Sequence, residues 1–125
     1  METVHSVKTM KAIQFSQYGS ADVLQYVNIN VPIIGDHEVL VEIKAIGVNF
    51  SDIARREGKY AVPMKLPFIP GSEIAGVVAA VGKEVKRFTP GMRVVALIEK
   101  GAYAEYVNVH EKALSEVPDD TSFTD

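Results

Sequence analysis

The hydrophobic pattern is clearest in the stretch Val39–Ile46, where apolar and polar side chains alternate. Val39 and Val41 occupy one set of alternate positions, and Glu42 and Lys44 occupy the other. Side chains of a β-strand point to opposite faces in turn. This period of two therefore predicts a half-buried strand whose valines face the core.

Shorter apolar stretches predict further strands, each bounded by residues typical of turns. Gly35-Asp36 precedes the alternating stretch, and Thr89-Pro90-Gly91-Met92 has the proline and glycine positions of a tight turn. The remaining strand candidates are Met10–Phe15, Leu24–Val31, Arg93–Ile98, Ala102–His110 and Leu114–Val117. Short strands at this spacing are typical of a sandwich or a partly closed barrel, so the expected fold is mainly β.

The stretch Pro70–Gly82 combines strand-forming residues with glycines at positions 71, 76 and 82. Its Val, Ile and Ala content favours a strand. A glycine inside a strand marks a place where a Cβ would collide with a neighbouring strand or with a ligand. Glycine in β-structure is more often a packing device, so we predict that Gly71 and Gly76 face a neighbouring strand.

A different pattern begins at Asn49, where the period of two stops. Asn49 followed by Asp52 resembles the start of a helix, with both side chains available to cap its first turn. Arg55-Arg56 suit the last turn, where cations meet the negative end of the helix dipole, and Gly58 is a natural stop. The predicted helix is Phe50–Glu57.

The segment Tyr60–Pro70 contains prolines at positions 63, 67 and 70 and shows no periodicity, so we expect an ordered loop. Loops held between scaffold elements often carry binding residues. The sequence therefore places one candidate site where Asn49–Tyr60 meets Gly71–Glu73.

Composition describes an ordinary globular chain. It has 125 residues, 47% hydrophobic and 23% charged, which suffices for one domain with a core. The net charge of −3 gives no electrostatic reason to expect nucleic acid or an anionic membrane surface. No apolar run approaches the roughly 20 residues that span a bilayer. The polar stretch Met1–Thr9 lacks the apolar run of a signal peptide, so we expect a disordered extension before a folded unit at residues 10–118.

The residue types give little support for a metal site or for thiol chemistry. No cysteine is present, which excludes thiolate zinc sites and thiol nucleophiles. The histidines at positions 5, 37 and 110 show no ligand spacing, so we expect surface or edge positions for them. The glycines of Pro70–Gly82 also lack the Gly-x-Gly-x-x-Gly spacing of a dinucleotide-binding loop.

Several blocks of the chain together resemble the medium-chain dehydrogenase/reductase superfamily, in its zinc-free quinone oxidoreductase (zeta-crystallin-like) branch. The matching blocks are Met10-Lys11-Ala12, Gly47–Asp52, Pro70–Gly82, Thr89–Val94 and Gly101–Tyr106. They extend from Met10 to about Pro118. The resemblance implies a GroES-like, partly open β-barrel with one short helix near residues 50–57. Such a barrel is the substrate-side half of a two-domain NADPH-dependent reductase.

The resemblance also implies roles for particular residues. Asn49, Asp52 and Tyr60 would be the catalytic-site residues: Asn49 near the nicotinamide, Asp52 ordering that corner beside the cofactor, and Tyr60 flanking the substrate. Zinc alcohol dehydrogenases have Cys and His at the positions that match Asn49 and Ser72. Neither replacement is a useful zinc ligand, so no catalytic metal is expected. Met92 stands where the family commonly has Asp, and we expect it to alter a turn but not the site.

The implied activity is zinc-free hydride transfer from NADPH to a quinone or an α,β-unsaturated carbonyl, in the cytoplasm. The glycine-rich nucleotide-binding domain is not among these residues, so we expect residues 119–125 to begin a linker to it. The fragment alone is then expected to be inactive and to hold NADPH weakly. An alternative is a stand-alone GroES-like binding or assembly module without catalysis. Self-association through exposed barrel surface stays open in both cases.

A structural interpretation stands beside each proposed role. Asn49 and Asp52 are adequately explained as helix caps, and Tyr60 could simply cover apolar surface from its loop. Glu73, inside an apolar strand, needs a hydrogen-bonded partner or exposure to water. Arg55-Arg56 are better explained as helix-end charges than as phosphate binders.

Overall fold

The computed structural model describes residues 9–48, 50–58 and 65–118. Its strands are β1 (Thr9–Gln14), β2 (Gln25–Asn30), β3 (Glu38–Gly47), β4 (Glu73–Val81), β5 (Arg93–Leu97), β6 (Tyr106–His110) and β7 (Leu114–Glu116), and its helices are α1 (Phe50–Arg56) and the 3-10 turns η2 (Ala21–Val23) and η3 (Glu111–Ala113). The predicted mainly β fold with one short α-helix is confirmed. The predicted linker and all of the predicted extension except Thr9, which begins β1, lie outside the described residues.

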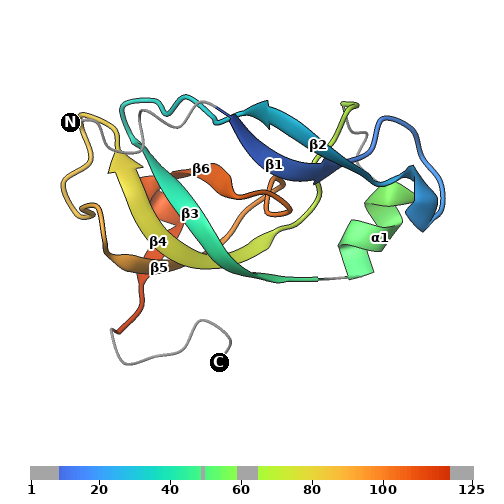
Figure 1. Cartoon of the computed structure of the whole chain (residues 1–125). Helices are drawn as coiled ribbons and strands as arrows, with labels where there is room; N and C mark the ends of the chain where they lie inside the picture. Colours follow the sequence, from blue (N-terminus) through green and yellow to red (C-terminus); the bar gives the residue numbers. More distant parts are fainter. Residues whose placement is uncertain (1–8, 49, 59–64, 119–125) are drawn as a thin grey trace.

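The strands form two antiparallel sheets that do not close into a complete barrel. β1 and β2 form a hairpin, and the larger sheet has the order β6-β3-β4-β5-β7. In Figure 1 the hairpin lies across the larger sheet, and α1 follows the end of β3 at one side. Backbone bridges from Ala12 to Ala104 and from Phe15 to Phe68 join the hairpin to the rest of the chain. The result is the partly open barrel that the sequence predicts.

β3 is an interior strand of the larger sheet: it pairs with β4 along one edge and with β6 along the other. Val39 and Val41 are fully buried, whereas Lys44 is exposed, so the predicted inward direction of the valines is confirmed. Leu40, on the opposite face, is buried too, which means that this end of the strand is covered on both sides.

Two groups of apolar side chains make up the interior. The larger one lies between the strands of the main sheet and the turns that follow β4; its members are Val39, Val41, Ile74, Val78, Val85, Phe88, Val94, Ala96, Ala102, Val107, Val109 and Leu114. The second lies under the hairpin, where the rings of Phe15 and Phe68 are 5.6 Å apart. Burial of such side chains is the main favourable term in folding a domain of this size.

The glycines of the Pro70–Gly82 stretch lie where the chain passes very close to itself. A Cβ at Gly76 would stand 2.2 Å from the carbonyl oxygen of Glu42 on β3, so this glycine faces a neighbouring strand as predicted. Gly71 has φ +104°, and a Cβ there would stand 2.5 Å from the Cβ of Ala102. Its neighbour is therefore a loop and not a strand, but the packing interpretation holds for both.

The strand predicted at Ala102–His110 is wrong over its first four residues, because the strand begins at Tyr106. The amides before it are bonded to other partners: Ala102 N donates to Gly71 O at 3.2 Å and Tyr103 N donates to Pro70 O at 3.0 Å. These bonds hold the segment in a loop. The pattern of apolar residues could not reveal them, since they come from a distant part of the chain.

The predicted helix and its stop are confirmed. α1 ends at Arg56, and Gly58 follows with φ +77°, a conformation that glycine adopts at little cost. Gly19 N donates to Arg56 O at 2.9 Å, and Arg56 Nε donates to Gly19 O at 3.2 Å. These bonds attach the end of the helix to the segment between β1 and β2.

Candidate active site

Three strand ends meet at the edge of the main sheet that leads to α1. In the strand register Gly47 is paired with Glu73, and Glu73 is paired with Leu97. The segments that continue from this row are Val48, which leads toward Asn49, and Ser72, whose carbonyl accepts a hydrogen bond of 2.7 Å from Ile98 N. The fold therefore brings Gly47 and Val48, which precede α1, to the same edge as Ser72 and Glu73.

Glu73 lies at the start of β4 with its side chain over Gly47. A Cβ at Gly47 would stand 2.2 Å from the Oε1 of Glu73, so this carboxylate would have to move if position 47 carried a side chain. Glu73 is exposed, which removes the cost of a buried charge in an apolar strand. The structural interpretation of Glu73 is therefore favoured.

A shallow groove of about 740 Å³ runs along these strand ends. Its lining residues are Ala45, Ile46, Gly47, Glu73, Ile74, Ala75, Val95, Ala96, Leu97, Ala113 and Ser115. Leu97, in this lining, is 75% exposed, and Val48, which follows Gly47 and lines a separate hollow together with Tyr103, is 68% exposed. Large apolar side chains this open to water at the rim of a groove are typical of a binding or docking surface.

Asp52 is the one buried charged residue in the described part of the chain, at 6% exposure. It lies in the first turn of α1, where the sequence predicts it. The hydroxyl of Tyr103 donates to Asp52 Oδ2 at 3.2 Å. Burial raises the pKa of Tyr103 to about 12, the charge and hydrogen bond of Asp52 act in the same direction, and Arg56 acts against them. Tyr103 is therefore a neutral donor at ordinary pH.

Tyr103, the partner of Asp52, is not among the site residues that the sequence predicts. It belongs to the Gly101–Tyr106 block of the family resemblance, but the apolar pattern assigned it to a strand. Tyr103 and Asp52 are 51 positions apart. No local pattern could pair them. Of the predicted site residues, Asp52 lies in this pair, whereas Asn49 and Tyr60 lie outside the described residues.

The arginines of α1 bind to neighbouring loops. Arg55 Nη1 donates to the carbonyl of Glu99 at 2.5 Å, two residues beyond the end of β5. Arg56 is bonded to Gly19 and lies 3.5 Å from the carboxylate of Glu57. These contacts favour the interpretation of Arg55 and Arg56 as structural helix-end charges.

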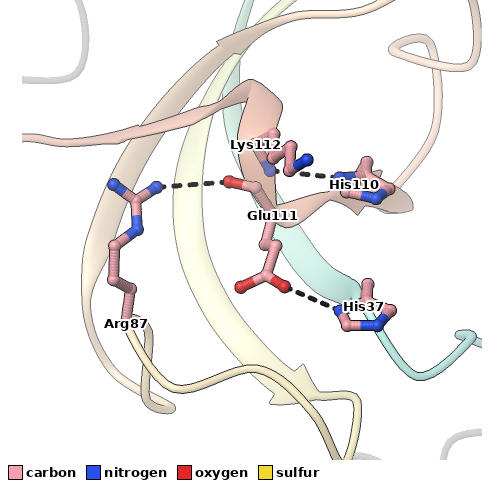
Figure 2. A network of polar contacts seen from close by, with 5 residues as sticks. All are labelled: His37, Arg87, His110, Glu111 and Lys112. Carbon is pink, nitrogen blue, oxygen red and sulfur yellow. Dashed lines mark hydrogen bonds and ion pairs between the residues drawn. The ribbon is translucent and has the colours of Figure 1, made fainter.

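A second polar cluster contains the histidines of the described residues, His37 and His110 (Figure 2). His37 Nδ1 lies 3.0 Å from Glu111 Oε2, Lys112 N donates to His110 Nδ1 at 3.2 Å, and Arg87 donates to the carbonyl of Glu111 at 3.3 Å. These bonds hold η3 against the turns beside it. In the described ranges, no group of three or more His, Asp or Glu side chains is arranged to hold a metal ion.

Met92 occupies the turn before β5. Its amide donates to Thr89 O at 3.2 Å, and its sulfur accepts a contact of 3.3 Å from Thr89 N. Its side chain also packs against the main core. The departure from the family thus falls in a turn, as expected.

The family profile of the alcohol dehydrogenase GroES-like domain matches residues 35–119. The chain belongs to this family. The relatives that it matches include quinone oxidoreductases. The quinone oxidoreductase of Lama guanicoe is 36% identical over 118 residues, which are 93% of this chain and 36% of that protein. The chloroplastic NADPH-dependent alkenal/one oxidoreductase of Arabidopsis thaliana is 39% identical over 127 residues, which are 93% of this chain and 33% of that protein.

Solved structures agree with the sequence relatives. The human synaptic vesicle membrane protein VAT-1 homolog-like protein superposes with a TM-score of 0.89 at 35% identity, covering 92% of this chain and 37% of its own. The quinone oxidoreductase of Escherichia coli, crystallised in complex with NADPH, superposes with a TM-score of 0.85 at 38% identity. The match covers 90% of this chain and 35% of that one. The chain thus spans about a third of the length of the relatives that it matches. None of the helices in residues 9–48, 50–58 and 65–118 has the length and apolar character needed to cross a bilayer.

Proposed function

We propose that this chain forms the substrate-side wall of a site that transfers hydride from NADPH to a quinone or an α,β-unsaturated carbonyl. The observation that carries the proposal is the row of strand ends at Gly47, Glu73 and Leu97, which lies along one groove. The relatives that share this fold include quinone and alkenal/one oxidoreductases. The oxidoreductase family membership supports the reaction class; the substrate class is our proposal.

The groove fits one part of the cofactor. Val48 and Leu97 offer an open apolar rim to a flat nicotinamide ring, and Asn49 and Asp52 would be the residues closest to it. No glycine-rich phosphate loop occurs in the chain, so the pyrophosphate would be held by a separate nucleotide-binding domain. We therefore propose that this chain alone holds NADPH weakly and is inactive. When bound, NADPH supplies the hydride.

The side chains of this chain would position the reactants and exclude water from them. Val48 and Leu97 would shield the reacting atoms from solvent once the cleft is closed, which strengthens every polar interaction inside it. Asn49 and Tyr60 would orient the substrate, and Asp52 would fix the corner of the site. We assign no residue as an obligatory acid or base.

The donor set argues against zinc. The chain contains no cysteine, and the positions that match zinc ligands in alcohol dehydrogenases hold Asn49 and Ser72. Amide and hydroxyl oxygens are poor replacements for thiolate and imidazole as zinc ligands. We propose that the reaction needs no metal. A cytoplasmic location is part of the same proposal, and whether copies self-associate stays a prediction for solution measurements.

The test uses the full-length gene product, with NADPH oxidation coupled to a quinone as the assay. Asn49→Ala and Tyr60→Phe are each expected to lower kcat about tenfold or more, because both remove a group that orients the reactants. Tyr26→Phe is the matched control: Tyr26 is 72% exposed on β2, and its variant should turn over like the wild type. Wild-type kcat in both site variants, with folding intact by circular dichroism, would remove these residues from the site.

A further inference from the structure

Tyr103 reaches across the molecule from the loop between β5 and β6 to the first turn of α1. Its hydroxyl donates to Asp52 Oδ2 at 3.2 Å. The carboxylate is 6% exposed, and a buried carboxylate is costly unless hydrogen bonds satisfy its oxygens. The hydroxyl of Tyr103 supplies one of those bonds.

The backbone and ring of Tyr103 are fixed by two other elements. Its amide donates to Pro70 O at 3.0 Å, and its carbonyl accepts from Ile13 N on β1 at 2.8 Å. Its ring lies against Gly71, where a Cβ would stand 2.6 Å from Tyr103 Cδ1. Gly71 lies two residues before Glu73, at the edge of the proposed site. Tyr103 is thus hydrogen-bonded to α1, to β1 and to the segment that enters β4.

The packing accounts for the ring but not for the hydroxyl. A phenylalanine would fill the same space against Gly71 and leave both backbone bonds in place. What it would remove is the bond to Asp52. The hydroxyl therefore has a role apart from packing, and that role concerns the orientation of Asp52.

We propose that Tyr103 is a positioning residue, whose hydroxyl fixes the carboxylate of Asp52 and with it the first turn of α1. The inference about catalysis rests on the proposed hydride-transfer function, whereas the inference about the helix does not. Loss of the hydroxyl should therefore loosen α1 locally and impair turnover, while the sheet stays intact.

The catalytic test compares Tyr103→Phe, Asp52→Ala and the double variant in the full-length gene product. Tyr103→Phe is expected to lower kcat for NADPH-dependent quinone reduction roughly tenfold, about the factor that one hydrogen bond to a charged group supplies, with KM for the quinone little changed. The double variant should be no slower than Asp52→Ala alone, because both changes break the same bond. Tyr106→Phe, on β6, is the control and should keep wild-type kcat.

The second readout is independent of turnover. Glu57 N donates to Ile53 O at 3.0 Å and Gly58 N donates to Arg55 O at 3.1 Å, so these amides report the opening of α1. In Tyr103→Phe their hydrogen exchange should accelerate several-fold, while that of Val78 N, which donates to Met92 O at 2.8 Å, stays at the wild-type rate.

The two readouts separate the possible failures. If the wild-type gene product reduces no quinone or enone with NADPH, the proposed function fails, and the exchange data alone decide the role of Tyr103. Unchanged exchange at Glu57 and Gly58, or an equal acceleration at Val78, would overturn the proposal. Additive losses of kcat in the double variant would overturn it as well, because they would mean that the two side chains act separately.

Discussion

At the scale of single residues, the decisive feature is a buried carboxylate that accepts a hydrogen bond from the hydroxyl of a tyrosine in a distant loop. Asp52 was predicted from a helix-start pattern, and the structure places it in the first turn of α1 as expected. Its partner Tyr103 was assigned to a strand. The pairing depends on the loop conformation that Pro70 and Gly71 impose on Ala102 and Tyr103. The periodicity of apolar residues cannot reveal contacts with backbone that is distant in the sequence.

The raised pKa of Tyr103 gives a prediction about stability at high pH. With a pKa of about 12 in the folded chain against 10.0 for the free side chain, the folded state keeps this proton after the unfolded state has lost it. The stability that Tyr103 contributes should therefore be fully present below about pH 10 and be lost as pH rises to about 12. Urea unfolding of wild type and Tyr103→Phe across this range measures it.

The comparison of wild type with Tyr103→Phe isolates the titration of the Tyr103 hydroxyl. Burial also raises the pKa of Tyr106, helped by Glu42 and Glu105, but this shift is present in both proteins and cancels in their difference. The free energy of unfolding of wild type, relative to Tyr103→Phe, should fall through the stated window. A difference that stays constant with pH would mean that the Tyr103 hydroxyl is not held in the folded chain as described.

At the scale of elements, the close approach of β3 and β4 sets the shape of the site edge. Gly76 lies on β4 opposite Ile43, where there is no room for a side chain. The register beyond this point pairs Gly47 with Glu73. The spacing of these two strands therefore determines how the groove residues line up.

Gly76→Ala should be strongly destabilising. The added Cβ would stand 2.2 Å from the carbonyl oxygen of Glu42, which is backbone and cannot swing away. Overpacking of this kind costs about 1–3 kcal/mol or more, measured as the free energy of unfolding in urea. Gly35→Ala is the matched control, because its nearest neighbour is the Glu38 side chain at 3.6 Å, an ordinary contact. Equal stability of the two variants would show that β3 and β4 are not this close.

Most elements could be predicted from local patterns, and the exceptions are one strand start and two short 3-10 turns. The alternation around Val39 and Val41, the stop at Gly58 and the turn at Thr89–Met92 are local signals, and the structure confirms them. The start of β6 and the 3-10 turns η2 and η3 were not predicted. In β6 the cause is the capture of its preceding amides by Pro70 and Gly71; η3 begins where the side chain of His110 accepts from Lys112 N.

At the scale of the whole molecule, the site lies on an open edge. Val48 and Leu97 are largely exposed, and the chain spans about a third of the length of its relatives. The family resemblance predicted the barrel, and the comparisons confirm the family. Which strand ends share an edge was not predictable from the pattern, because it depends on the sheet order β6-β3-β4-β5-β7. The roles of Asn49 and Tyr60 stay predictions.

The central claim is that the barrel supports hydride transfer from NADPH without a metal. The most direct measurement is quinone-dependent NADPH oxidation by the full-length gene product, before and after treatment with a strong chelator, together with the metal content of the same sample. We expect the same turnover in both states and far less than one zinc ion per chain, since Asn49 and Ser72 offer no useful zinc ligands. A stoichiometric zinc ion whose removal abolishes turnover, and whose return restores it, would contradict the claim.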